Sequence, residues 1–245
     1  MKRVFFMLLV FLFSTAVAGA AELRIITEIA PPLNYTEDGT ETGKLTGQAV
    51  EIVREVQKRI GDTTPIEVMP WARGYKLAQT EPNVMLFSTT RTEAREALFQ
   101  WVGPVGFNEW VFLAKKDSPI KVASLDDAKK AGSVGAYQND SRELFLKDQG
   151  FTNIDTSDDP ETILKKMLLG RNDLWLTDLA EYRSLAKKQG VDPSELMPVF
   201  TVKKTELYMA FSKAAPAEVV QKWSKAIDDM KADGTYNAII AKWSK

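Results

Sequence analysis

Two hydrophobic periods alternate along the chain, and their order predicts an α/β fold. Short apolar runs with the length of buried strands are followed by segments in which apolar residues recur every three or four positions. The run Val84-Met85-Leu86-Phe87 is the clearest strand, and Gln48 to Ile60, followed by Gly61, is the clearest helix. Because strands and helices alternate, we expect mostly parallel sheets with helices on their faces.

The expected elements form two α/β units. The first has strands at 22–27, 65–69 and 84–87 and helices at 48–60, 72–79 and 93–98. The second has strands at 133–136 and 174–176 and helices at 141–149, 161–169 and 179–188. Extended segments at 101–113 and 197–205 connect the units, the latter leading into a central strand at 206–211. Helices at 217–232 and 235–242 end the chain.

Two α/β units joined by two crossings predict two lobes with a cleft between them. We expect lobe 1 to contain residues 22–107 and 206–245, and lobe 2 to contain residues 108–205. The hinge is expected at Phe107-Asn108 and at 201–205. Ligands of open α/β sheets bind beyond the carboxyl ends of the strands, which here are 88–90, 138–141 and 177–178.

The N-terminal segment predicts export. Residues 1–21 combine Lys2 and Arg3, an apolar block from Val4 to Phe13 and small residues up to Ala21, which is typical of a cleaved signal peptide. The apolar block is short for a membrane anchor. Because the chain has no cysteine, neither a lipidated N-terminal cysteine nor a disulfide is expected, and the periplasm is the predicted location.

Charge and composition restrict the function. Removal of 1–21 would leave 30 basic and 33 acidic residues, and the basic residues are scattered, which argues against nucleic acid as a partner. Without histidine or cysteine, the usual general base, thiol nucleophile and zinc ligands are missing. We therefore expect binding rather than catalysis, with no metal and no cofactor.

A candidate anion pocket follows the strand at 84–87. Thr90-x-x-Glu93 has the spacing of a capping box that would start a helix, and the N–H groups of a helix start favour an anion. The hydroxyls of Ser88 and Thr90 add donors, and Arg95 can hold a carboxylate with two parallel hydrogen bonds. The alternative is a surface helix on which Arg95 pairs with a nearby acid.

Several motifs resemble one family. They are Gly43-Lys44-Leu45-Thr46-Gly47, Ser88-x-Thr90-x-Thr92-x-x-Arg95, Val134-Gly135-x-x-Gln138 and Met230-Lys231-Ala232-Asp233-Gly234-Thr235-Tyr236 with Lys242-Trp243. The mature chain resembles the periplasmic solute-binding proteins of the polar amino-acid class (bacterial extracellular solute-binding family 3 type), which deliver substrates to ABC importers. The resemblance implies a type II periplasmic binding fold, a monomer and a membrane permease as partner. It also implies that Arg95 and Thr90 hold the ligand α-carboxylate and that Asp178 takes the α-ammonium.

Asp178 has a second interpretation, because Asp178-x-x-Glu181 is also a capping box for the helix that follows. The two roles are compatible. A carboxylate opposite Arg95 would provide the two-point recognition that a zwitterion requires.

Further side chains could shape specificity. Trp71 could stack on a ligand, Arg73 could add a positive charge, and Ser141 and Arg142 stand at a second helix start facing the cleft. These residues predict a cationic pocket that prefers an acidic amino acid or another small carboxylate. The alternatives are that Trp71 belongs to the core and that Arg73 forms an exterior ion pair.

Two other functions stay open at this point. A periplasmic prephenate or arogenate dehydratase of the same fold would need a buried carboxyl as general acid, and Glu28 and Glu143 are candidates by location. A sensory ligand-binding subunit would report to a membrane receptor instead of an importer.

Overall fold

The computed structural model describes residues 23–38 and 43–243. The expected signal peptide at 1–21 lies outside these residues. Among the described residues, no helix has both the length and the apolar character needed to cross a membrane.

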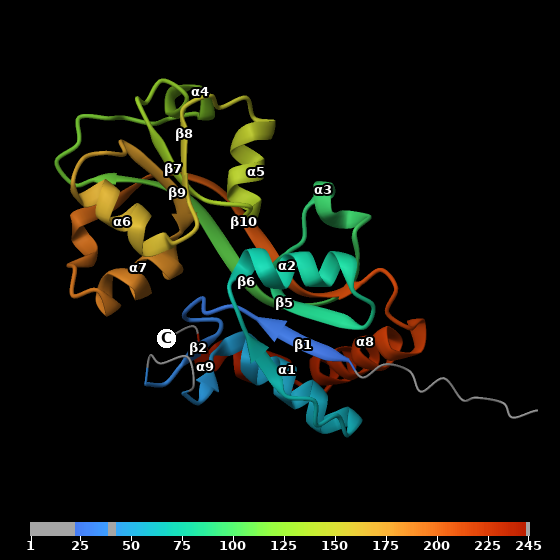
Figure 1. Ribbon diagram of the computed structural model, residues 1–245. Helices are drawn as coiled ribbons and strands as arrows, with labels where there is room; N and C mark the ends of the chain where they lie inside the picture. The colour runs from blue at the N-terminus through green and yellow to red at the C-terminus, as the bar shows by residue number, and fades with distance from the viewer. Residues whose placement is uncertain (1–22, 39–42, 244–245) are drawn as a thin grey trace, which may run out of the picture.

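One mixed sheet of eight strands runs through the described chain (Figure 1). Two long strands, β6 and β10, lie at its centre and pair antiparallel, with Asn108 opposite Thr205 midway. On one side β1 pairs in parallel with β4 and β5, and on the other β7 pairs in parallel with β8 and β9. In spatial order the strands are β4 (Ile66–Val68), β1 (Arg24–Thr27), β5 (Val84–Thr90), β10 (Leu196–Ser212), β6 (Phe99–Lys115), β9 (Leu174–Asp178), β7 (Val134–Tyr137) and β8 (Ile154–Ser157).

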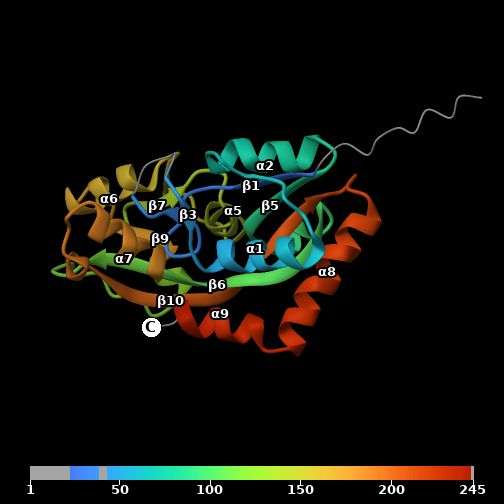
Figure 2. The ribbon, with the colours of Figure 1, turned by 90° about the horizontal axis from the view of Figure 1, so that it is seen from below.

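Lobe 1 is built around β1, β4 and β5, and its helices cover both faces of the sheet (Figure 2). Successive side chains of a strand point to opposite faces. Ile25 and Met85 therefore pack with α1 and α8, whereas Ile26 and Leu86 pack with α2. The helices are α1 (Gln48–Ile60), α2 (Trp71–Thr80), α3 (Glu93–Glu96), α8 (Ala217–Ala232) and α9 (Thr235–Trp243), and a two-stranded hairpin joins β2 (Tyr35–Thr36) to β3 (Leu45–Thr46).

Lobe 2 repeats this arrangement around β7, β8 and β9. Phe112 and Leu176 face one hydrophobic cluster, which includes Leu146 of α5, and their neighbours Val111 and Trp175 face the cluster formed with α6 and α7. Both faces of the lobe 2 sheet are thus buried by helices. The helices are α4 (Leu125–Ala128), α5 (Ser141–Asp148), α6 (Pro160–Leu168), α7 (Leu179–Lys188) and the 3₁₀ turn η1 (Pro193–Glu195).

The two-lobed α/β prediction is confirmed, whereas several local predictions differ, among them the unpredicted short helix α4 and the two elements described next. Strand β8 was not predicted, because its sequence Ile-Asp-Thr-Ser carries a single apolar residue. The capping box expected at Thr90 is wrong. Strand β5 extends through Thr90, and α3 begins after Thr92 without a side-chain cap.

Candidate functional site

A small cavity lies between the lobes, where the carboxyl ends of β1, β5, β7 and β9 meet. Its volume is about 40 Å³, which is room for about three water molecules. This is the edge at which open α/β sheets bind ligands. The charged and hydroxyl side chains of the lining are those of Glu28, Ser88, Thr90, Asp140, Arg142, Asp178 and Glu181.

Ser88 reaches the cavity through a β-bulge. Between the pairs Leu86–Ala210 and Thr89–Tyr208, β5 has two residues and β10 has one. Ser88 has a positive φ of 60°, which is uncommon outside glycine, and such a bulge redirects the side chain. Its Oγ donates to Oδ1 of the buried Asn34 at 2.5 Å. Asn34 in turn donates to the backbone oxygen of Glu28, so one amide ties the ends of β1 and β5 together.

Arg95 is a buried cation that forms no ion pair among the described residues, although its charge, after that of Arg142, helps to lower the pKa of Asp140. The residue is 1 % exposed, and its guanidinium carbon lies 5.2 Å from the ring centre of Trp71 and 4.8 Å from that of Tyr75. Its hydrogen bonds to the carbonyl oxygens of Thr90 at 3.4 Å and Asn139 at 3.5 Å are long. Its Nε has no partner, and no carboxylate of the described residues forms an ion pair with it. Arg95 stands directly behind Thr90 and Trp71 of the cavity lining.

Among the residues that the structure describes, three hydrogen bonds cross the cleft directly. Trp71 of lobe 1 donates its indole N–H to the carbonyl oxygen of Asn139 in lobe 2 at 3.1 Å, and Arg95 donates to the same oxygen. The hydroxyl of Tyr137 donates to the Glu28 carboxyl at 3.3 Å. Asn139 has a positive φ of 60°, and its N–H donates to Glu143 at 2.5 Å. The structure therefore has the lobes in direct contact around the cavity.

Asp178 caps α7, as its sequence spacing predicts. Oδ1 accepts from the N–H groups of Ala180 and Glu181, and Oδ2 accepts from the N–H of Glu109 at 2.6 Å. Burial raises the pKa of Asp178 to about 6, although these N–H donors oppose the shift. The group is still ionised at neutral pH. A carboxylate has about four acceptor positions, so one is left for a ligand.

Arg142 lies in the cavity wall between two carboxylates. Its Nε donates to Asp140 at 2.5 Å and its NH1 to Glu181 at 2.6 Å. Burial alone lowers the pKa of Arg142, but attraction to Asp140 and then to Glu181 raises it well above its usual value. The neighbouring Ser141 is buried as the first residue of α5, with its Oγ 3.5 Å from Asp140.

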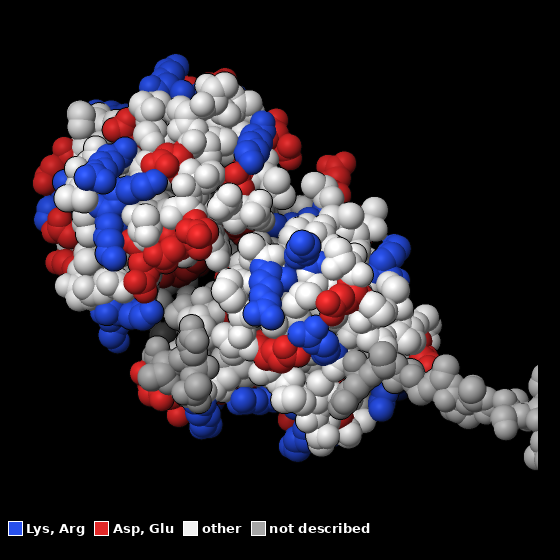
Figure 3. Space-filling view, viewed as in Figure 1, with Lys and Arg blue, Asp and Glu red and all other residues white. Residues whose placement is uncertain are grey.

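The cavity is acidic, which corrects the expectation of a cationic pocket. Its lining holds four carboxyl groups and one guanidinium. Arg73 does not line the cavity, because it lies on the exposed face of α2, where its charge lowers the pKa of Glu67. Figure 3 shows acidic side chains over α6 and α7 where the surface is hollowed between the lobes.

The carboxyl of Glu28 in the cavity has a strongly raised pKa. Burial, and then the nearby charges of Glu181 and Asp140, raise its pKa to about 8, whereas Arg142 opposes the shift. At neutral pH the group is therefore mostly protonated. A protonated carboxyl at neutral pH satisfies one requirement of a general acid. The other candidate, Glu143, forms an ion pair with Lys147 at 2.6 Å and accepts from the N–H of Asn139.

Sequence reasoning missed part of the cleft. Asp140, Glu181, Tyr137 and Asn139 were not predicted to meet there, although Asp140 falls inside the expected strand end at 138–141. No cluster of three or more acidic groups in the described residues has the geometry to hold a metal ion.

A two-lobed α/β fold with a polar cleft at the strand ends is the architecture of a solute-binding protein. The chain belongs to the bacterial extracellular solute-binding proteins, family 3, whose family model matches residues 23–245.

Individual relatives agree with this assignment. The L-cystine-binding protein TcyJ of Escherichia coli (strain K12) is 26 % identical over 215 residues, which cover 87 % of this chain and 78 % of TcyJ. The L-cystine-binding protein TcyA of Bacillus subtilis (strain 168) is 24 % identical over 209 residues, which cover 85 % of this chain and 76 % of TcyA. Among solved structures, an ancestral arginine-binding protein bound to arginine superposes with a TM-score of 0.75 at 25 % identity, covering 91 % of this chain and 97 % of the other.

A histidine kinase sensor domain with similarity to periplasmic binding proteins superposes with a TM-score of 0.79. The identity is 19 %, and the superposition covers 90 % of this chain and 95 % of the sensor domain. This likeness shows the fold.

Proposed function

We propose that the protein binds an amino acid in the cleft between its lobes and delivers it to the permease of an ABC importer. One observation carries the proposal: the buried guanidinium of Arg95 forms no ion pair with a carboxylate among the described residues, and its Nε has no hydrogen-bond partner. A buried charge without a partner is costly, so such groups are retained where a ligand completes them. The α-carboxylate of an amino acid supplies the missing charge.

The remaining contacts complete a two-point site for a zwitterion. The hydroxyl of Thr90, whose backbone oxygen accepts from Arg95, lines the cavity and can donate to the same carboxylate. Ser88 also lines the cavity, but its hydroxyl would have to leave its hydrogen bond to Asn34 before it could donate to the ligand. Asp178 lies on the opposite lobe with one acceptor position left for the α-ammonium. Trp71 covers Arg95 and faces the cavity, where its ring can contact the ligand side chain.

Binding requires the lobes to separate first. The cavity is smaller than an amino acid, and the carbonyl of Asn139 stands where Arg95 would meet a carboxylate. We place the hinge at Phe107-Asn108 and at 201–205, where β6 and β10 pass between the lobes and their pairing register shifts between Thr201 and Lys203. The corresponding lobes are 22–107 with 206–245, and 108–205.

The relatives support this function and its location. Two are L-cystine-binding proteins, and a solved neighbour binds arginine, so amino acids are the ligands to test first. We propose the periplasm as the site of action, after cleavage of the signal peptide at 1–21, with a monomer acting without metal or cofactor. The dehydratase alternative is not favoured, because the family and its named relatives are binding proteins.

Mass spectrometry of ligand released by denaturing the purified protein tests the proposal directly. We expect an intact amino acid, and calorimetry with that compound should show one site per chain. Aromatised product after incubation with prephenate or arogenate would contradict binding as the function. Failure of a full panel of amino acids to bind, with other carboxylates binding instead, would move the ligand class to simple carboxylates.

A further inference from the structure

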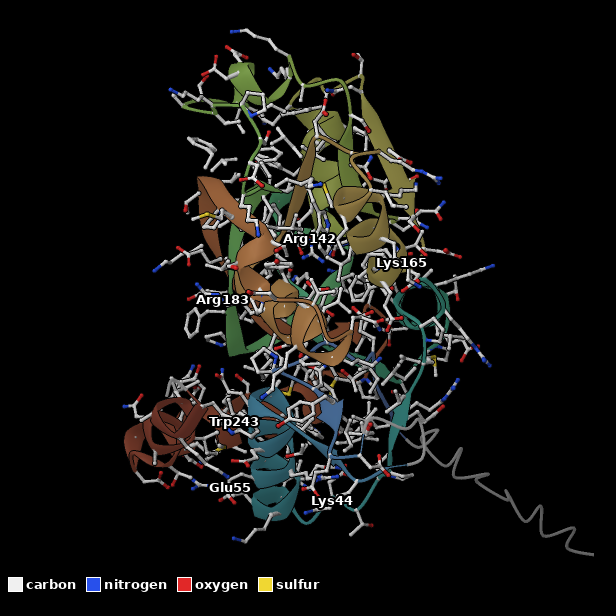
Figure 4. All side chains as sticks on the ribbon, turned by 90° about the vertical axis from the view of Figure 1, so that its left-hand side faces the viewer. Lys44, Glu55, Arg142, Lys165, Arg183 and Trp243 are labelled. Carbon is white, nitrogen blue, oxygen red and sulfur yellow. The ribbon has the colours of Figure 1, made fainter. Side chains whose placement is uncertain are left out.

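The guanidinium of Arg142 is held as a bound ligand would be held. Two carboxylates contact it from different helices: Asp140 is the N-cap of α5, and Glu181 lies in the first turn of α7. Thr177 Oγ1 accepts from the same NH1 at 3.5 Å. The side chain of Arg142 is 7 % exposed, and those of Asp140 and Glu181 are 13 % and 19 % exposed. Figure 4 labels Arg142 inside lobe 2 and Arg183 of the same lobe toward its outer side.

The other carboxyl groups of the cavity are also engaged. Glu28 accepts from Tyr137, and Asp178 accepts from three backbone N–H groups. The raised pKa of Glu28 leaves it mostly uncharged at neutral pH. A second cation entering beside Arg142 would meet a like charge, with the nearest two carboxylates already paired.

We propose that Arg142 determines specificity by filling a guanidinium subsite of the cleft with its own side chain, which excludes ligands that carry a cationic side chain. The subsite consists of Asp140, Glu181 and Thr177. A planar guanidinium, which donates several hydrogen bonds in fixed directions, fits this subsite better than the compact charge of an ammonium group. The permitted ligands are then amino acids with uncharged or zwitterionic side chains. The first test of this inference, a ligand-binding assay, rests on the proposed amino-acid function. The second test, which uses the guanidinium ion, is independent of that function.

The ligand assay compares L-glutamine with L-arginine by calorimetry. Wild type should bind L-glutamine at least about tenfold more tightly than L-arginine. Arg142→Ala should reverse this order, because it opens the space and frees both carboxylates. Arg142→Lys keeps the charge and should keep the exclusion. Arg183→Ala is the matched control, because Arg183 is exposed on α7 outside the cavity lining, and it should bind as wild type does.

The second assay uses the guanidinium ion as the probe and measures the melting temperature. Guanidinium chloride at low millimolar concentration should raise the melting temperature of Arg142→Ala relative to the same concentration of sodium chloride. Wild type and Arg183→Ala should show no such difference. Arg142→Gln is measured in parallel and replaces the alanine variant if that variant folds poorly. The glutamine amide can still donate to Asp140 or Glu181.

The two assays separate the possible failures. If wild type binds no amino acid, the proposed function fails, and the guanidinium assay still decides the role of Arg142. Wild-type binding of L-arginine as tight as that of L-glutamine overturns the inference and leaves the amino-acid function standing. Equal salt effects on wild type, Arg142→Ala and Arg142→Gln also overturn it.

Discussion

The indole N–H of Trp71 in lobe 1 donates to the carbonyl oxygen of Asn139 in lobe 2, at 3.1 Å across the cleft. Arg95 donates to the same oxygen at 3.5 Å. One peptide carbonyl thus receives two donors from the lobe that is proposed to hold the ligand carboxylate. This internal contact therefore occupies the position that we propose for the ligand carboxylate.

We expect Trp71→Phe to shift the unliganded protein toward open forms. The substitution keeps the ring but removes a hydrogen bond worth about 1 kcal/mol, which changes the closed-to-open ratio about fivefold. Small-angle scattering should show a larger radius of gyration without ligand. Trp101→Phe is the control, because Trp101 donates its indole N–H to Glu96 within lobe 1 at 3.2 Å. Identical scattering from Trp71→Phe and wild type would show that this hydrogen bond does not hold the lobes closed.

Arg95 should be essential for ligand affinity. Arg95→Ala leaves the ligand carboxylate unpaired in the cleft, which costs about 2–5 kcal/mol, or tens-fold to thousands-fold in affinity. Arg95→Lys should also weaken binding, because a lysine cannot form two parallel hydrogen bonds. Calorimetry measures both losses. The matched control is Arg91→Ala, whose side chain pairs with Glu96 on the surface, and unchanged affinity in folded Arg95→Ala would contradict the site.

Asp178→Asn should reduce recognition of the ligand ammonium while leaving the fold intact. Asparagine is as good an N-cap as aspartate, so α7 should keep its start. Wild type should bind the amino acid much more tightly than its deaminated analogue, because the analogue leaves the Asp178 charge without its ligand partner. The variant should bind the two compounds with a smaller difference. If the variant and wild type discriminate equally between the amino acid and its deaminated analogue, the role of Asp178 is limited to capping α7.

Glu28 should make stability fall as pH rises. Its folded pKa of about 8 lies above the ordinary value of 4.5, so the folded state holds a proton that the unfolded state has released. Relative to Glu28→Gln, wild type should lose unfolding free energy between about pH 4.5 and pH 8, by up to about 1.4 kcal/mol per pH unit.

Urea unfolding of both proteins across this pH range measures the Glu28 effect. The raised pKa of Asp178 acts in the same direction between pH 3.8 and about 6, but it is common to both proteins and cancels in the difference. Glu93→Gln on the exposed surface of α3 is the control and should follow wild type. A pH-independent difference between wild type and Glu28→Gln would contradict the raised pKa.

Much of the fold was predictable because it depends on local periodicity. The helix at 48–60 and the helix at 179–188 begin and end as predicted. The first combines an apolar face with the stop residue Gly61, and the second begins after its cap Asp178. The residues at the strand ends were predictable for the same reason: Ser88, Thr90 and Asp178 lie in the last residues of buried strands and line the cavity. Strand β8 was missed because its pairing with β7, rather than its own pattern, makes it a strand.

The sequence by itself determined the two-lobed α/β class, the strand-end edge that lines the cavity and the position of Arg95 just after β5, because these features are encoded in short segments. Only the tertiary structure decided the charge of the cleft. Arg142 and Glu181 are far apart along the chain and pair through the folding of lobe 2, and contact between the lobes then brings Glu28 within reach of both charges. Electrostatic energy depends on distance and burial rather than on sequence spacing, so a pocket expected to be cationic from Arg73 and Arg142 is acidic in the folded protein.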